Sequence, residues 1–427
     1  DVTATKEDQG VNELFAFIWT RKDGIRTIAD EAKALGVKWQ DGLWEPYQAT
    51  AISSDGRYIA GWGDLDGETY EPWLFTLAPS NEIVVNSTTD RPRSANASGC
   101  ETGQFIANGE RECTLRSAME AVNAGVGNTI EFDIPGSIVP VITLTKALPA
   151  LSKSVKIDGS TQQAGRVEIR GSGLDLVGLD IIAGKSEIRN LVMNGFLGDN
   201  SVCIRLKDGG ENRVLGNFLG MDASGSVSVA TSYGLSINGS DGNQIGGGEA
   251  GSQNVIGSYL GIGIRGDRNK ILGNRIGIGL NDSLLPEVTD GLGILSGNDN
   301  EIGGDGNLRN LVAAEDWDIL VLPEVPIDGL SIVGNRIGLD GSGTLAHAGR
   351  GVSIGVITAT TLSLSDLRIH NNQIAGGSPE IWLAGGGISG PSITNNTVGL
   401  AFDGSGNLPT FVSDQNRDFG IRLDNSS

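Results

Sequence analysis

The sequence predicts an all-β protein whose larger part is a parallel β-helix with three short strands in each coil. Three observations support this prediction: 65 of the 427 residues are glycine, one motif recurs at nearly constant spacing, and short alternating apolar runs separate its copies. The motif Gly-Asn-X-apolar-Gly occurs at 216–220, 273–277 and 334–338, with a variant at 395–399. Its asparagines, Asn217, Asn274, Asn335 and Asn396, are therefore 57, 61 and 61 residues apart. Repeats of this length, which bury their apolar side chains only by stacking, are typical of solenoids.

Further asparagine steps within each period indicate that a period contains several coils. A second step lies at Asn254, Asn310 and Asn372, and a third lies at Asn243 and Asn300. With one coil for each step, a period holds three coils of about 20 residues, and residues 128–427 form about 14 coils. Parallel strands stack about 4.8 Å apart, which makes a rod about 65 Å long. We expect the asparagines at corners, where an amide can bond to the same residue one coil above.

Residues 1–80 differ from the repeats and are predicted to form a small β-domain. They contain five of the seven tryptophans and three strand-like runs, Leu14–Thr20, Arg57–Trp62 and Pro72–Leu77. The segments AFIWT, ATAISSDGRYIAGWG and EPWLFTL resemble the HAF repeat of bacterial extracellular proteins. Units of this kind stack on neighbours to bury a core, so the resemblance implies further copies before residue 1.

Residues 81–127 are predicted to form a linker and a cap that contains a helix. Leu115, Ala118, Met119 and Val122 recur with helical spacing, and Thr114 is a suitable N-cap. Four segments in this order, CTLRSAMEAVNA, NTIEFDIPG, ITLTKALPAL and VKIDGSTQQAG, resemble the CSLREA module. The resemblance implies an exported bacterial protein with a right-handed β-helix, here residues 128–427, behind an N-terminal cap. It implies no particular catalytic residues.

The cap contains two of the three cysteines. A disulfide between Cys100 and Cys113 that closes the cap loop is the favoured interpretation, given the export that the resemblance implies. Two free thiols in a reducing compartment are the alternative. Cys203 alternates with apolar neighbours, and we expect it to be a small buried residue rather than a nucleophile.

The composition argues against several classes of function. A total of 31 Lys and Arg against 52 Asp and Glu gives a net charge of −21, which argues against nucleic acids, anionic membranes and acidic polysaccharides as partners. No apolar stretch is long enough for a transmembrane helix. The only two histidines, His347 and His370, argue against a histidine-based zinc site or a Ser-His-Asp triad.

A recurring Asp-X-Ser-Gly turn follows three copies of the motif and contains Asp222, Asp340 and Asp403. Stacked carboxylates could bind calcium through oxygen atoms. Each copy supplies only one carboxylate, so an Asx turn, in which the Asp side chain caps its own loop, is the favoured interpretation. We therefore predict no cofactor, with calcium as the alternative.

An acidic–aromatic wall is the main candidate functional site. Counting from the second asparagine step places Tyr259, Glu315, Asp316, Trp317, Asp318, Glu380 and Trp382 on one wall of successive coils. Tyr259, Trp317 and Trp382 are the candidate ligand-binding residues, because aromatic faces beside hydrogen-bond acceptors bind sugar rings. If Ile381 and Leu383 point inward, alternation places Trp382 outside.

The acidic members of this wall are the candidate catalytic residues of an enzyme. In that case Glu315, Asp316, Asp318 and Glu380 would supply an acid and a base for glycoside cleavage. The favoured interpretation of these residues is nevertheless structural: a tryptophan packed at a corner beside a solvated acidic turn, because the spacing of carboxylates around a coil does not follow from the sequence.

The sequence favours a non-enzymatic extracellular or cell-surface protein, either a structural rod or an adhesin. The alternative is a carbohydrate-active enzyme (a glycoside hydrolase or polysaccharide lyase) or a carbohydrate-binding module that uses the wall. Expected partners are polysaccharides or other surface proteins. Residues 420–427 begin another strand and then stop, so we also expect further chain there or self-association through an end of the β-helix.

Overall fold

The chain forms two compact units, Asp1–Asn81 and Glu82–Ser427. The computed structural model describes residues 3–8, 11–20, 24–34, 45–52, 58–64, 70–76, 81–136, 138–343, 351–359, 361–376, 379–399 and 420–424.

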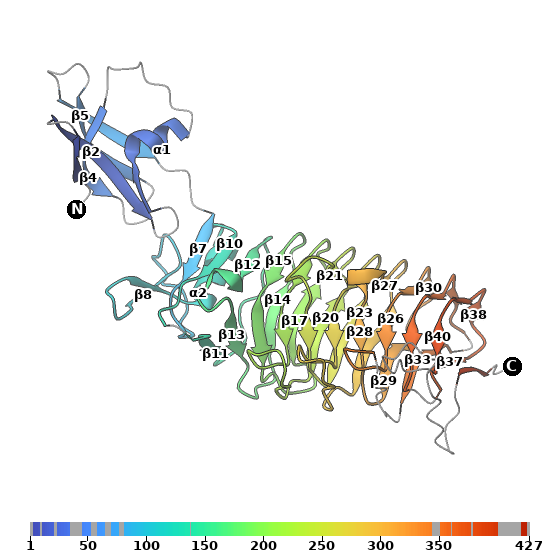
Figure 1. The fold of residues 1–427 in the computed structure, drawn as a ribbon. Helices are drawn as coiled ribbons and strands as arrows, with labels where there is room; N and C mark the ends of the chain where they lie inside the picture. The colour runs from blue at the N-terminus through green and yellow to red at the C-terminus, as the bar shows by residue number, and fades with distance from the viewer. Residues whose placement is uncertain are drawn as a thin grey trace. The chain divides into compact units, whose positions relative to one another are not determined.

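The first unit consists of two three-stranded antiparallel sheets and a short helix (Figure 1). Its elements are β1 (Thr3–Asp8), β2 (Val11–Thr20), β3 (Gly24–Thr27), α1 (Ile28–Ala34), β4 (Glu45–Ile52), β5 (Tyr58–Asp64) and β6 (Tyr70–Thr76). Apart from Arg57 and Leu77, which lie outside the described residues, the three strand-like runs fall in β2, β5 and β6, so these predicted strands are confirmed. Ala16, Ile28, Ala49, Ile59 and Trp73 form the small core.

The second unit is a parallel β-helix, in which each coil passes through three long sheets in turn (Figure 1). Sheet 1 contains β7 (Glu82–Val85), β10 (Thr129–Phe132), β12 (Lys156–Asp158), β15 (Glu187–Arg189), β18 (Arg213–Leu215), β21 (Gln244–Gly246), β24 (Lys270–Leu272), β27 (Glu301–Gly303), β31 (Ser331–Val333), β35 (Arg368–His370) and β39 (Ser392–Thr394). Sheet 2 contains β11 (Val141–Thr143), β13 (Val167–Arg170), β16 (Leu191–Asn194), β19 (Phe218–Leu219), β22 (Val255–Ile256), β25 (Arg275–Ile276), β28 (Leu311–Val312), β32 (Arg336–Ile337), β36 (Gln373–Ile374) and β40 (Thr397–Val398).

Sheet 3 forms the remaining long side of the β-helix and carries the candidate site. It contains β14 (Val177–Ile181), β17 (Val202–Lys207), β20 (Tyr233–Asn238), β23 (Leu260–Arg265), β26 (Asp290–Ser296), β29 (Trp317–Val321), β33 (Val352–Ile357), β37 (Ile381–Ala384) and β41 (Ile421–Asp424). A short fourth sheet contains β30 (Ile327–Asp328), β34 (Leu364–Ser365) and β38 (Ile388–Ser389). Two short 3₁₀ turns lie at Gly159–Thr161 and Gly306–Leu308. The predicted three-stranded parallel coils are confirmed.

One asparagine ladder, buried except at Asn396, runs along the corner between sheets 1 and 2. It contains Asn217, Asn254, Asn274, Asn310, Asn335, Asn372 and Asn396 in consecutive coils. The Nδ2 of each of the first six donates to the Oδ1 of the next asparagine at 2.8–3.2 Å. The same Nδ2 atoms also donate to main-chain carbonyls, for example that of Asn335 to Ile302. The ladder therefore satisfies backbone groups that the corner would otherwise leave unpaired.

The number of coils predicted for each period is wrong. Asn217, Asn254 and Asn274 occupy consecutive coils of one corner, so the period of the motif contains a long and a short coil rather than three equal coils. The third step, Asn243 and Asn300, belongs to a separate corner ladder at the start of sheet 1. The three long sheets accordingly have eleven, ten and nine strands among the described residues, fewer than predicted.

A helix and a hairpin form the cap. Helix α2 (Leu115–Ala124) begins at the N-cap Thr114 and ends at Gly125, whose φ of 88° is the left-handed conformation that glycine favours. Leu115, Ala118, Met119 and Val122 are buried in the same core as the β-helix strands, which confirms the predicted apolar face.

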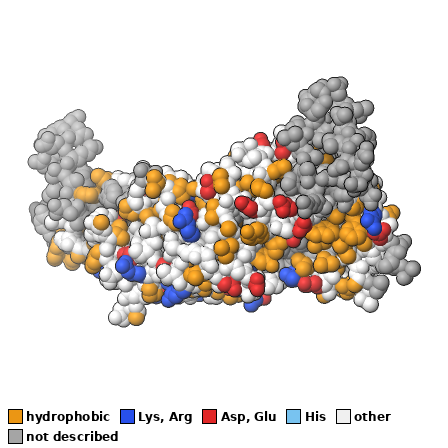
Figure 2. Space-filling model, turned by 90° about the horizontal axis from the view of Figure 1, so that it is seen from below, with side chains coloured by type: hydrophobic (Ala, Val, Ile, Leu, Met, Phe, Trp, Pro, Cys, Tyr) orange, Lys and Arg blue, Asp and Glu red, His pale blue; other side chains and the backbone are white. Residues whose placement is uncertain are grey.

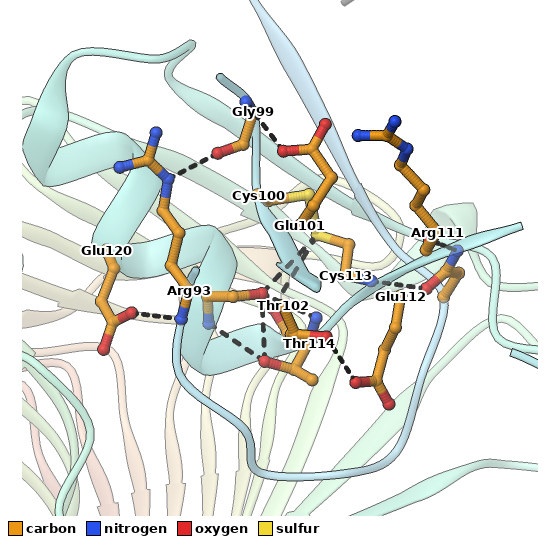
Figure 3. Close-up of a disulfide and its surroundings, with 12 residues drawn as sticks. Arg93, Gly99, Cys100, Glu101, Thr102, Arg111, Glu112, Cys113, Thr114 and Glu120 are labelled. Atoms are coloured by element: carbon orange, nitrogen blue, oxygen red, sulfur yellow. Dashed lines mark hydrogen bonds between the residues drawn. A yellow bond between two sulfur atoms is a disulfide. The ribbon is translucent and has the colours of Figure 1, made fainter. Parts of the chain in front are cut away.

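The predicted disulfide is present at the edge of the cap (Figure 3). Cys100 precedes β8 (Glu101–Phe105), and Cys113 ends β9 (Arg111–Cys113). Their Cα atoms are 5.3 Å apart. Glu112 lies beside them and is buried; burial alone would raise its pKa, but hydrogen bonds from Thr102, Thr89, Ser87 and Arg91 lower the pKa to about 2.

Candidate functional site

The outer face of sheet 3 carries Trp317 and Trp382. Its strands pair in register, so residues one coil apart form rows parallel to the β-helix axis. The first outward row contains Tyr233, Leu260, Asp290 and Trp317, and it ends at the buried Val352. The second contains Ser236, Gly263, Gly293, Leu320, Gly355 and Trp382. On the face that Figure 2 shows, hydrophobic side chains gather toward the C-terminal coils, with Asp and Glu side chains among them.

The two indoles stack across an intervening strand. The ring centroids of Trp317 and Trp382 are 6.1 Å apart, and the ring planes are inclined by 13°. The ring of Trp317 lies over Gly355, where a Cβ atom would overlap it. Both tryptophans remain partly exposed. Ile381 and Leu383 are buried, so Trp382 points outward as alternation predicts.

The last described strand holds the outer side of Trp382. Its Nε1 donates to Asp424 Oδ2 at 3.0 Å. The guanidinium of Arg422 lies 5.5 Å from the centre of the indole and pairs with Asp424 at 2.8 Å. These contacts fix the orientation of the ring on the sheet surface.

The segments of the predicted wall are two coils apart rather than in successive coils. Leu260 and Trp317 are separated by the rung of Asp290, and Leu320 and Trp382 are separated by that of Gly355. The reason is that Asn254, Asn310 and Asn372, which precede these segments, are themselves two coils apart along the asparagine ladder. Tyr259 is exposed at the start of its strand, and its carbonyl accepts a hydrogen bond from Thr289 of the next coil.

The four acidic residues of the wall fall into two groups. Glu315 and Asp316 are exposed in the turn before β29. Asp318 and Glu380 are 5% and 1% exposed and face the interior of the corner instead. They precede Ile319 and Ile381, which both pair with Ile354 of the coil between them, and Ser353 is the equivalent residue of that coil. Two coil spacings separate them by about 10 Å along one row.

Burial controls the ionisation of both interior carboxyl groups. It raises the pKa of Asp318 to about 8, although hydrogen bonds from the Ala314 N–H, at 2.7 Å, and from Ser353 oppose the shift. It also raises the pKa of Glu380, against a hydrogen bond from the Gly420 N–H. Asp318 and Glu380 therefore share one buried row, whereas Glu315 and Asp316 lie outside it in solvent.

A trough, which the sequence alone did not predict, lies on the same face of sheet 3. Its volume is about 230 Å³, and its floor is formed by Gly263 and Gly293 of β23 and β26. Leu260 and Asp290 line one side, Arg265 and Leu322 line the other, and Leu320 closes the end toward the tryptophans. The sequence signal that could have indicated the trough is glycine at an outward strand position. It occurs in the runs Gly261-Ile-Gly-Ile and Gly291-Leu-Gly-Ile, which contain Gly263 and Gly293.

The charged groups of the trough are one ion pair and one carboxyl group, and Tyr233 and Ser236 also line it. Arg265 forms a bidentate pair with Glu324, with both N···O distances 2.8 Å. Burial and the nearby Asp316 raise the pKa of Asp290, and a hydrogen bond from the Trp317 backbone opposes this. The Oδ1 atom of Asp290 is buried without a hydrogen-bond partner among the described residues.

The calcium candidates form hydrogen-bonded turns. Asp222 Oδ1 accepts from the Ser224 hydroxyl at 2.7 Å, and Asp340 accepts from that of Ser342 at 2.8 Å. Asp403 lies outside the described residues. Within the described ranges, no group of three or more His, Cys, Asp or Glu side chains is arranged to hold a metal ion.

Cys203 lies in the core of the β-helix, fully buried. Burial raises the pKa of its thiol, which keeps the sulfur protonated and unreactive.

Comparisons with known proteins give no family assignment: no protein-family model, no curated protein and no solved structure matches the chain. In the part of the chain that the structure describes, no helix is both long and apolar enough to cross a membrane.

Proposed function

We propose that the protein is a non-enzymatic extracellular β-helix that adheres to a neutral polysaccharide through the outer face of sheet 3. The observation that carries the proposal is the partly exposed stack of Trp317 and Trp382. Flat aromatic surfaces of this kind bind the apolar C–H faces of sugar rings. The disulfide of the cap supports an oxidising, extracellular location.

The charge around the tryptophans favours a neutral ligand. Glu315 and Asp316 are exposed beside Trp317, and the whole chain carries a net charge of −21. An acidic polymer would be repelled by this face. Hydroxyl groups of a neutral sugar, by contrast, can donate hydrogen bonds to the carboxylates.

A glycoside hydrolase or polysaccharide lyase has weaker support. An acid and a base must reach opposite sides of the scissile bond. Asp318 and Glu380 have raised pKa values, but they lie in one row and are almost completely buried. Glu315 and Asp316 are accessible, yet both belong to one turn on one side of the tryptophans.

The experiment is a binding screen of the purified chain against a panel of neutral and acidic glycans, followed by calorimetry. We expect weak binding of a neutral glycan, little changed by salt because the contacts are largely uncharged. Trp382→Ala should lower the affinity by at least about tenfold. Trp62→Ala is the control, since Trp62 is 47% exposed but belongs to the first unit. Equal binding by parent and Trp382→Ala, or binding of acidic glycans alone, would overturn the proposal.

A further inference from the structure

We infer that the trough is a second subsite for the same polysaccharide, so that one extended glycan chain lies parallel to the β-helix axis from the trough to the tryptophan stack. This inference rests on the proposed function. It adds the direction of the glycan relative to the β-helix axis and the length of glycan that the site binds. It also identifies Asp290 as a residue that orients one of the sugars.

The trough and the tryptophans lie on one line. Gly263, Gly293, Leu320, Gly355 and Trp382 occupy consecutive rungs of the second outward row. Four coil spacings therefore separate the first glycine from Trp382, a distance of about 19 Å. Leu320 lies between the trough floor and the ring of Trp317, so an apolar surface continues from one to the other.

The two floor glycines have no structural requirement for glycine. Neither Gly263 nor Gly293 has a positive φ, unlike many glycines at the corners. No described heavy atom lies within 4 Å of a Cβ placed on Gly263, and the nearest to one on Gly293 is Leu295 Cδ1 at 3.7 Å. Glycine inside a strand weakens it, whereas a β-branched residue would pack well there. What the glycines provide is an uncovered stretch of sheet on which a ring can lie flat.

The walls suit a sugar better than a purely apolar ring. Asp290 lines the trough and is only partly buried, so the accessible part of its carboxylate can accept a hydrogen bond from a sugar hydroxyl. The opposite wall combines Leu322 with Arg265, whose charge is already neutralised by Glu324. The residues that line the trough therefore present apolar surface, one carboxylate, the hydroxyl groups of Tyr233 and Ser236, and no unpaired positive charge for an anionic group.

The test measures affinity against chain length. Cello-, xylo- and manno-oligosaccharides, from disaccharide to octasaccharide, are titrated into the parent, Gly293→Val and Asp290→Ala by calorimetry. For the series that binds, we expect the parent affinity to rise with length until the chain covers both subsites. Gly293→Val should lower the affinity for chains that reach both subsites by at least about tenfold and leave the disaccharide affinity unchanged. Asp290→Ala should act in the same direction.

Ser331→Val is the matched control, because Ser331 is an outward residue of β31 in sheet 1. It should bind every length as the parent does. If Gly293→Val has an unchanged melting temperature and binds long chains as the parent does, the trough is not a second subsite. This conclusion holds even if Trp382→Ala abolishes binding. If no oligosaccharide binds the parent, the proposed function and the second subsite both fail.

Discussion

The indole of Trp317 reaches across one coil to stack on that of Trp382, with the ring centroids 6.1 Å apart. The rings come from β29 and β37, which are not neighbours in sheet 3, since β33 lies between them. Gly355 of β33 makes the contact possible, because any Cβ there would overlap the Trp317 ring. The stack is thus built from three coils of the β-helix.

Replacing Gly355 should displace this stack. We expect Gly355→Ala to lower the free energy of unfolding by about 1–3 kcal/mol through overpacking and to change the near-ultraviolet circular dichroism of the coupled indoles. Gly263→Ala is the control: its Cβ meets open space, so the stability should be unchanged or higher by about 0.5–1 kcal/mol. An unaltered spectrum and melting temperature for Gly355→Ala would contradict the geometry of the stack.

The asparagine ladder should make a large contribution to stability. Asn335 Oδ1 accepts from the Asn310 N–H and its Nδ2 donates to the Ile302 carbonyl and to Asn372. Asn335→Leu leaves these buried groups unpaired and should cost about 1–3 kcal/mol in the free energy of unfolding. Denaturant unfolding measures the change. Asn307→Leu, at an exposed position, should have little effect; equal losses for both variants would argue against the ladder.

The disulfide should stabilise the cap. The Cys100–Cys113 bond spans 13 residues of the chain, and a loop of about this length corresponds to about 2–4 kcal/mol. We expect Cys100→Ser/Cys113→Ser to unfold at lower denaturant concentration than the oxidised parent. Intact-mass analysis of protein prepared without reductant is the companion measurement, and recovery of two free thiols there would refute the bond.

The buried Asp318 should make stability depend on pH. Its pKa is about 8 in the folded chain, against an ordinary value of 3.8. Between these values the folded state holds a proton that the unfolded state has released. The stabilisation is therefore complete below about pH 4 and declines as the pH rises toward 8, by up to about 1.4 kcal/mol per pH unit.

Asp318→Asn isolates this effect, because an amide cannot ionise and its oxygen can still accept from the Ala314 N–H. The difference in unfolding free energy between Asp318→Asn and the parent should shift in favour of the variant as the pH increases from 4 to 8, the interval set by the two pKa values. A difference that stays constant over this interval would show that Asp318 is not buried as a neutral acid.

The fold could be predicted from the sequence because its signals are local and repeated. Alternating apolar residues, the cap helix after Thr114 and the recurrent Asn all have direct structural causes. The coil length could not be obtained in this way. Asn254 and Asn274 belong to one ladder although the residues around them differ, and only the hydrogen bonds between coils reveal that the 60-residue period contains two turns.

The candidate site was predicted in part. Trp317 and Trp382 were singled out, and alternation placed Trp382 on the outside. Their stacking could not be predicted, since it depends on the missing side chain of Gly355 one coil away. Nor could the sequence separate Asp318 from Asp316. Their exposures differ because β29 has two consecutive buried positions, Asp318 and Ile319, which a simple alternating pattern does not contain.

Binding of a neutral glycan along the outer face of sheet 3 is tested most directly by a crystal structure of the protein soaked with the longest neutral oligosaccharide that binds. We expect a sugar ring against the Trp317–Trp382 stack, with the glycan continuing over Leu320 toward Gly293 and a hydroxyl within hydrogen-bond distance of Asp290. A sugar bound to another sheet, or to the ends of the β-helix with the outer face of sheet 3 bare, would contradict it.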